Sequence, residues 1–199
     1  LALVLGVAAV IIVWPHVPGY IQGRFTVVID HITGNPDTYV EQTQGRGWQQ
    51  TRSILAIGSG GLFGQGYLQG TQTQSASEEA LPARHTDEIF AVCGEEFGMV
   101  GCILVILLLT AIILRCVWVA RRANSPMAAY VAMGYAAMLL LQTVINIGMC
   151  LYVFPVVGLT LPFFSSGGSS IITLYACMGI VSGIKMRSLP SWLRDRSQL

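Results

Sequence analysis

Long apolar runs alternate with polar stretches along this chain, and the runs have the composition of membrane-spanning helices. A spanning helix needs about 20 consecutive apolar residues, so the first run, which is shorter, is interpreted as the end of a truncated span. The pattern predicts an all-α polytopic membrane protein with about four transmembrane helices. The apolar runs cover residues 1–14, 89–119, 127–153 and 171–184.

Two segments of different character separate these runs. Residues 15–88 are polar and rich in Gly, Gln and Thr, and they are predicted to be a long loop, a kind of segment that is usually functional or disordered. Residues 154–170 are apolar, but Pro155 and Pro162 exclude a continuous helix there. This segment is expected to be a re-entrant loop or broken helix that faces a cavity, with an ordinary hairpin between two spans as the alternative.

The basic residues orient the expected spans. The turn after residues 89–119 carries arginines without an acid, and the tail at residues 185–199 is also basic, whereas residues 15–88 carry more acids than bases. Short cytoplasmic loops are enriched in Lys and Arg. The turn and the tail are therefore predicted to be cytoplasmic, and the long loop is predicted to be extracytoplasmic.

Composition excludes several other classes of protein. Of the 199 residues, 53% are hydrophobic and 11% are charged, whereas soluble domains carry about 25% charged residues. No basic cluster of the kind that binds nucleic acid is present. The cysteines lie in or beside apolar runs without a CxxC pair, which favours helix packing over disulfides or a zinc site. Because the chain begins inside an apolar run, we expect the C-terminal portion of a longer protein.

The most informative stretch is LPARHTDEIFAVCGEEFG at residues 81–98, where charged side chains gather at the start of an apolar helix. Ionisable groups at a bilayer are costly and indicate a functional site, although charged residues also end helices at the interface. Asp87 is the preferred candidate, as a general base with a raised pKa or as a ligand that holds a divalent cation against phosphate. Glu95 and Glu96 are expected to be structural, because on a continuous helix Glu95 would lie about 12 Å farther along the axis.

A glycine-rich loop, GSGGLFG at residues 58–64, resembles a phosphate-binding loop. The nucleotide-binding fingerprint needs a strand before it and a helix after it, and neither is evident here. Nucleotide binding is therefore rejected, and a flexible loop lying against a membrane surface or lipid head group is expected instead.

Three ordered motifs resemble those of the SEDS proteins (shape, elongation, division and sporulation), which include RodA, FtsW and SpoVE. LPARHTDEIFAVCGEEFGMVG is similar to the family hallmark, IGSGGLFGQGYLQGTQTQ to the glycine-rich segment before it, and PVVGLTLPFFSSGGSS to the C-terminal Pro/Gly signature. The resemblance covers residues 48–186. It implies a ten-helix fold, of which this chain would hold the C-terminal spans.

The resemblance also implies an activity. A SEDS protein of this kind is a peptidoglycan glycosyltransferase, a hexosyltransferase that polymerises lipid II into glycan strands for cell elongation, division or sporulation. The implied partner is a class B penicillin-binding protein (transpeptidase), and the implied location is the bacterial cytoplasmic (inner) membrane, with the active site on the extracytoplasmic side. An essential acid of the family's outer loop matches Asp87.

The proposed chemistry needs a base near the attacking hydroxyl and positive charge near the diphosphate leaving group. Asp87 is the expected base. Arg84, Arg52 or a divalent cation, Mg²⁺ or Mn²⁺, is expected to meet phosphate. The candidate substrate-binding residues are Arg84, His85, Thr86, Gln72, Ser165, Gly167 and Gly168.

The C-terminal signature is expected to contribute to the same site. Residues 154–170 are predicted to fold back beside Asp87 and to share one lipid-substrate cavity with it. Gly167 and Gly168 are predicted to permit a close backbone approach, so a bulky side chain at either position would obstruct the site.

Several residues depart from the family pattern. Glu88 stands where an aromatic residue is usual, Ala83 where an acid is frequent, and Ser166 where tyrosine is usual. Glu88 is expected to raise the pKa of Asp87 by like-charge repulsion. GTQTQ favours the elongation type and GLTLPF the division and sporulation types, so the subtype stays open.

Two other functions stay open at this point. A lipid II flippase or transporter explains the broken helix and the intramembrane acids equally well, but it predicts a site near the bilayer midplane rather than at the outer edge. A non-catalytic scaffold of the cell-wall synthesis machinery would leave Asp87 replaceable.

Overall fold

The computed structural model describes residues 14–34, 40, 43–74, 81 and 83–188. The predicted truncated span falls almost entirely outside this part of the chain, as does most of the predicted tail. Within the described residues all regular structure is helical, which confirms the predicted fold class. The elements are η1 (Trp14–His16), α2 (Gly19–Thr33), α4 (Trp48–Gly60), α5 (Ile89–Arg121), α6 (Pro126–Cys150) and α7 (Gly168–Arg187).

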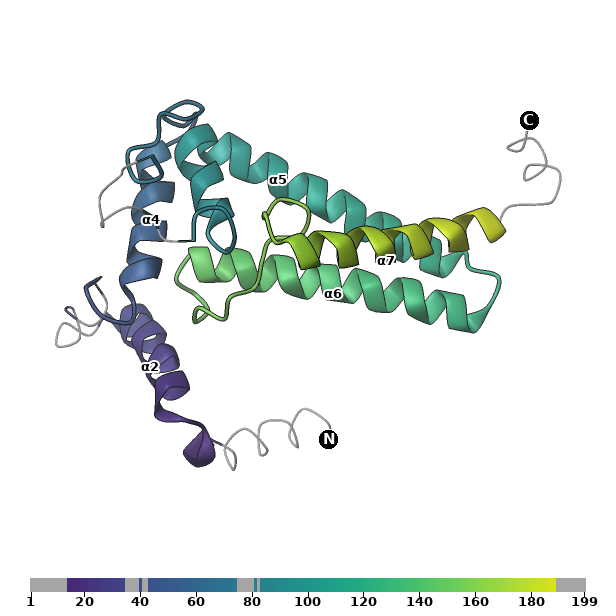
Figure 1. Ribbon diagram of the computed structural model, residues 1–199, viewed down its shortest axis with the longest axis horizontal. Coiled ribbons are helices and arrows are strands. Elements are labelled where there is room, and N and C mark those ends of the chain that lie inside the picture. The colour runs from purple at the N-terminus through teal and green to yellow at the C-terminus, as the bar shows by residue number, and fades with distance from the viewer. Residues whose placement is uncertain (1–13, 35–39, 41–42, 75–80, 82, 189–199) are drawn as a thin grey trace.

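Three of these helices, α5, α6 and α7, are long and apolar enough to cross a membrane, and they lie side by side as a bundle (Figure 1). The start of α6 follows from local sequence: Ser125 is the N-cap, its Oγ accepts a hydrogen bond from the Ala128 amide at 3.2 Å, and Pro126 occupies the first turn. The bundle therefore corresponds to the three later apolar runs, with ends shifted by a few residues.

Small and medium apolar side chains fill the bundle interior. Tyr135 on α6 is buried among them, and its hydroxyl donates to the Leu174 carbonyl of α7 at 2.8 Å. The opposite faces of the helices expose large apolar side chains such as Leu107 and Leu141, each 60% exposed, as lipid-facing helices do. The cysteines in this interior are free thiols, as the packing interpretation predicts: Cys116 and Cys150 are buried.

The described part of the long loop at residues 15–88 includes the helices α2 and α4, which the sequence did not predict. Figure 1 shows α2 and α4 together at one end of the bundle. Each helix buries only a narrow side: Val27 and Val28 of α2 pack against Tyr152, and Ala56 of α4 packs against Ala91. Arg24 also donates from α2 to the Val156 carbonyl at 2.5 Å.

A sharp bend divides α5 at Gly98, where φ is 67° and ψ is −162°. The turns before Gly98 run beside α4 across the end of the bundle, and the turns after it run along the bundle (Figure 1). The continuous helix assumed from the sequence is therefore wrong. Glu95 and Glu96 do not lie deeper in a span; they lie next to the loop that follows α4.

The glycine-rich loop at residues 58–64 is bound to this bend and so is not the flexible loop that was expected, whereas its contact with a membrane surface or lipid head group stays a prediction. A bend leaves backbone groups without helical partners, and the loop supplies partners for them. Its exposed side chains include Leu62 and Phe63, at 61% and 82% exposed. The amides of Met99 and Val100 donate to Gly61 and Leu62 at 3.0 and 3.2 Å, and the carbonyls of Glu95 and Glu96 accept from Gln65 and Gly66 at 2.9 and 3.1 Å.

Candidate active site

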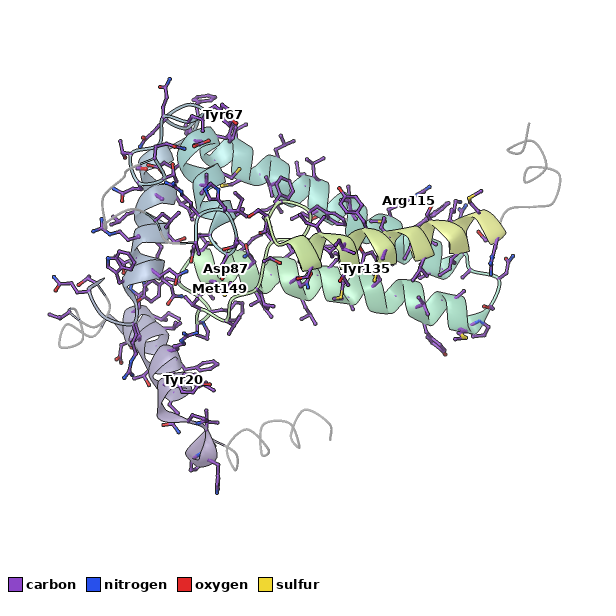
Figure 2. The ribbon with its side chains drawn as sticks, viewed as in Figure 1. Tyr20, Tyr67, Asp87, Arg115, Tyr135 and Met149 are labelled. Atoms are coloured by element: carbon purple, nitrogen blue, oxygen red, sulfur yellow. The ribbon has the colours of Figure 1, made fainter. Side chains whose placement is uncertain are left out.

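Asp87 lies in the turn at residues 83–88, directly before α5. Figure 2 shows Asp87 near the end of the bundle covered by α2 and α4, whereas Arg115 lies toward the other end. Its side chain is half-buried, and burial raises the pKa of the Asp87 carboxyl above its ordinary value of 3.8. No hydrogen bond or ion pair to this carboxylate is found among the described residues, so the group is available to a ligand.

A buried amide fixes the backbone of Asp87. The Nδ2 atom of Asn146, on α6, donates to the Asp87 carbonyl at 2.8 Å and to the Leu159 carbonyl at 2.7 Å. Asn146 is fully buried, so both bonds are shielded from water. One α6 side chain thereby ties the Asp87 turn to the segment at residues 154–170.

That segment folds back beside Asp87, as the sequence predicts. The hydroxyl of Ser165 donates to the Thr86 carbonyl at 2.6 Å. Ser166 donates twice to the His85 carbonyl, from its amide at 2.9 Å and from its hydroxyl at 2.7 Å. Gly158 lies near the carboxylate itself, since a Cβ added there would lie 3.6 Å from Asp87 Oδ2.

The two glycines predicted to need close approach do not behave as expected. A Cβ at Gly168 would meet no atom within 4 Å, so the packing argument is wrong there. A Cβ at Gly167 would lie 3.3 Å from the Ser170 Cβ and 3.4 Å from the Thr160 Cγ2, which is a tight contact but with side chains only. Beside Asp87, the backbone requires glycine at Gly158, where φ is 71°. A role of Gly167 and Gly168 in substrate binding stays a prediction.

The remaining candidate residues divide into two groups. His85 and Thr86 stay at the Asp87 turn, where His85 is exposed and the Thr86 hydroxyl donates to Ala83 at 3.2 Å. Arg84 instead donates to the Thr73 carbonyl. Gln72 lies in the same preceding loop, where its amide donates to Glu95 at 2.7 Å.

Glu95 and Glu96 have the structural role expected of them, through hydrogen bonds to the loop after α4 that the sequence did not predict. Glu95 is fully buried, and its carboxylate accepts from the amides of Gln72 and Thr73 at 2.7 and 2.9 Å. Glu96 accepts from the Gln74 side chain at 3.1 Å. Hydrogen bonds to a charged acceptor are the stronger kind, so these acids hold the loop after α4 against α5.

A cavity of about 480 Å³ lies next to the Asp87 turn. Its wall is mainly apolar but includes the polar side chains of Gln74, His85 and Glu96. Leu161 and Phe164 contribute to it from residues 154–170. Asp87 is not part of the wall. The Asp87 turn and the C-terminal signature therefore do share a cavity, through His85 rather than through Asp87.

Comparison with known proteins shows the family of this chain. The family model for FtsW, RodA and SpoVE, described as "Cell cycle protein", matches residues 1–189. The chain belongs to this family. The three motifs that resemble the SEDS proteins meet around one site: the glycine-rich segment supports α5, and the hallmark and the C-terminal signature join at Asp87.

Individual relatives of the FtsW, RodA and SpoVE family share much of the sequence. The chain is 46% identical over 140 residues to the peptidoglycan glycosyltransferase MrdB of Escherichia coli (strain K12), covering 70% of this chain and 37% of the relative. It is 39% identical over 140 residues to the probable peptidoglycan glycosyltransferase FtsW of Bacillus subtilis (strain 168), covering 70% and 34%. It is 37% identical over 148 residues to the stage V sporulation protein E of the same strain, covering 74% and 39%.

A solved structure shares the fold. It is described as "Structural coordination of polymerization and crosslinking by a peptidoglycan synthase complex", and it matches with a TM-score of 0.68 and 27% identity over 96% of this chain and 48% of that chain. The chain thus spans less than half the length of these proteins, which fits the prediction that it is a portion of a longer family member.

Sequence reasoning missed the residues that position the site. Asn146 bonds to two loops, whereas polar side chains in membrane spans commonly bond between helices. Gln50 on α4 was not singled out, yet it is buried and donates to the Phe154 carbonyl at 2.7 Å. A polar residue inside an apolar run was the available signal for Asn146, but Gln50 lies in a stretch where polar residues are ordinary.

Glu88 is turned into the protein, away from the role the sequence suggested for it. The side chain is fully buried, with Ser53 and Cys150 against it, and Gln49 Nε2 donates to its Oε1 at 3.2 Å. Its Oε2 has no hydrogen-bond partner in the described structure. Burial raises the pKa of Glu88, and the charge of Asp87 adds to the effect. The raised pKa of Asp87 itself comes from burial, rather than from the like-charge repulsion that was expected.

We expect Glu88→Gln to change how stability depends on pH. The pKa of Glu88 in the folded protein is raised above 4.5. Its contribution to stability is therefore fully present below about pH 4.5 and is lost as the pH rises through the folded pKa. Glutamine has nearly the same shape as glutamate and does not titrate. Thermal unfolding of both proteins across a pH series should therefore show little difference in acid and a growing advantage for the variant as pH rises. A constant difference across the series would contradict a buried neutral acid.

Proposed function

We propose that the protein containing this chain is a peptidoglycan glycosyltransferase that polymerises lipid II, with Asp87 as its catalytic base. The observation that carries the proposal is a half-buried carboxylate without a protein partner, held between the hallmark turn and the C-terminal signature. The names of the family relatives, which are peptidoglycan glycosyltransferases, support the same activity.

In the proposed reaction Asp87 accepts the proton of a sugar hydroxyl on one lipid-linked substrate. The hydroxyl oxygen forms a bond to the anomeric carbon of the second substrate, and the bond from that carbon to the diphosphate breaks, so the diphosphate leaves with the electron pair. General base catalysis of this kind requires the ionised form of the acid. Burial without a cationic partner makes Asp87 a stronger base than an exposed aspartate.

Charge on the diphosphate needs an additional partner. No group of three or more His, Cys, Asp or Glu side chains that could hold a metal is found among the described residues. Mg²⁺, however, is commonly bound by one or two carboxylates together with substrate phosphate oxygens. As the alternative to its role as base, Asp87 would hold Mg²⁺ or Mn²⁺ against the phosphate oxygens, and the ion would supply positive charge to the leaving group.

The cavity of about 480 Å³ beside His85 is proposed to accept an apolar part of the substrate. Pockets of this size with apolar walls and few polar groups are typical ligand sites. His85 would then border the polar part of the substrate, because it lines the cavity and belongs to the Asp87 turn. Thr86 and Ser165 are proposed to contribute beside it, since Ser165 donates to the Thr86 carbonyl next to His85.

The chain is a membrane protein, and we place it in the bacterial cytoplasmic membrane with Asp87 on the extracytoplasmic side. Arg115, Arg121 and Arg122 lie in the last turns of α5 or cap it. Figure 2 shows Arg115 toward the end of the bundle away from Asp87, which supports this orientation. A class B penicillin-binding protein is the proposed partner, since the similar solved structure is that of a complex for polymerization and crosslinking.

Membrane orientation gives a direct prediction. In a background without native cysteines, an impermeant thiol reagent should label Gln69→Cys in intact cells with a permeable outer layer, and it should not label Arg121→Cys. Both positions are exposed, so accessibility within the protein does not limit the reaction. Labelling at position 121 with protection at position 69 would reverse the proposed orientation.

The activity itself is tested with the purified full-length protein and lipid II, by following the growth of glycan strands on a gel. Polymerisation without any added glycosyltransferase is the expected result. Movement of lipid II across a vesicle membrane without polymerisation would favour the flippase instead. Absence of both polymerisation and lipid II movement, with intact assembly of the cell-wall machinery, would favour the scaffold.

A further inference from the structure

At the bundle end away from Asp87, three cationic side chains surround one aromatic ring. The Arg115 and Arg122 guanidinium carbons lie 4.3 and 4.2 Å from the centroid of the Trp118 ring, and Lys185 Nζ lies 3.8 Å from it. Arg115 and Trp118 belong to α5 and Arg122 caps it, whereas Lys185 comes from α7. The cluster therefore joins the two helices.

No acid in this part of the chain balances the cluster. Residues 97–187, which include the long arm of α5 and all of α6 and α7, contain no Asp or Glu. A single aromatic ring attracts each cation by only about 0.5–1 kcal/mol at an exposed site, and the cations repel one another. The arrangement is complementary to an anion.

A groove continues from two of these cations along the bundle. It lies between α5 and α7, has a volume of about 730 Å³, and is lined by Arg115, Lys185 and Ser182 together with apolar side chains. The apolar part includes Ile112, Phe163 and Met178. Positive charge thus meets a groove that is otherwise suited to a hydrocarbon chain.

We propose that this groove binds an anionic phospholipid, with its phosphate between Arg115 and Lys185 and an acyl chain along α5 and α7. A bilayer supplies such a molecule at high concentration, and basic pockets between transmembrane helices are suited to acidic lipid head groups. Both halves of the site match one amphipathic ligand: the cations match the phosphate, and the walls match the chain. This proposal does not depend on the proposed transferase activity.

The test uses the full-length protein in nanodiscs that contain phosphatidylcholine with or without phosphatidylglycerol. After gentle release, native mass spectrometry counts the lipid molecules that stay bound. The wild type should retain phosphatidylglycerol in preference to phosphatidylcholine. Removing both groove cations, with Arg115→Gln and Lys185→Gln, should lower that retention by about ten- to thirtyfold, given the usual contribution of each cation near an anionic lipid surface.

A matched control removes the same number of charges from the same end. Arg121→Gln with Arg187→Gln leaves the groove unchanged, because neither residue lines it, and it should retain phosphatidylglycerol as the wild type does. A second variant, Ala111→Phe, fills the groove without changing charge, since Ala111 is an exposed lining residue, and it should also lose the lipid. Equal loss in the control pair, or equal retention of the two lipids by the wild type, would overturn the proposal.

Discussion

Asp87→Asn is expected to abolish lipid II polymerisation while expression and membrane insertion stay intact. Asparagine keeps the shape of the side chain and removes its ability to accept the hydroxyl proton. General base catalysis typically contributes about 10²–10⁴-fold to a rate, so strand synthesis should fall by at least that factor. The fold should tolerate the change, because the hydrogen bond from Asn146 goes to the backbone carbonyl of Asp87 rather than to its side chain.

The matched control is Asp30→Asn, which makes the same exchange on α2 at a partly exposed position. It should polymerise lipid II at a rate near that of the wild type. The wild-type rate should also decline in acid, as Asp87 becomes protonated, and the decline should begin at a higher pH than an ordinary carboxyl would give, because its pKa is raised above 3.8. Near-normal strand synthesis by Asp87→Asn would remove Asp87 from the catalytic role.

The sequence was most informative where physical constraints act on long segments. Hydropathy located the three spans, because a helix in lipid must be apolar over most of its length. The polar stretch before them was harder to interpret. Helices α2 and α4 bury narrow faces, and Gly, Gln and Thr dilute the periodic signal, so a loop was predicted where helices form.

The candidate site was predicted in its main residue but not in its supports. Asp87 and residues 154–170 come together as expected, since two prolines exclude a helix and leave the segment free to return to the Asp87 turn. Asn146, Gln50 and Gly158 act through contacts between residues distant in sequence. Such contacts depend on the path of the chain, which the local pattern of residues does not reveal.

Gly98 is the clearest example of a feature that the pattern concealed. A glycine inside an apolar run usually indicates close helix packing, and here it marks the bend of α5 instead. The bend places the first turns of α5 beside α4, and so it sets the position of the Asp87 turn.

Gly98→Ala is therefore expected to destabilise the protein strongly and to reduce activity as a consequence. The observed backbone conformation, with φ of 67° and ψ of −162°, costs other residues about 1–3 kcal/mol. In addition, a Cβ would lie 2.4 Å from the Gly64 amide nitrogen and 2.6 Å from the Leu62 carbonyl oxygen. These are backbone atoms and cannot rotate away, so the loop after α4 would have to detach from α5.

The control for that experiment is Gly134→Ala on α6, where an added Cβ would meet no atom within 4 Å. Alanine is favoured over glycine inside a helix by about 0.5–1 kcal/mol, so this variant should unfold at the wild-type temperature or slightly above it. Thermal unfolding of the purified full-length proteins compares the two glycines directly. If Gly98→Ala unfolded at the same temperature as Gly134→Ala, the glycine-rich loop would not be holding the bend, and the support proposed for the Asp87 turn would have to come from α6 alone.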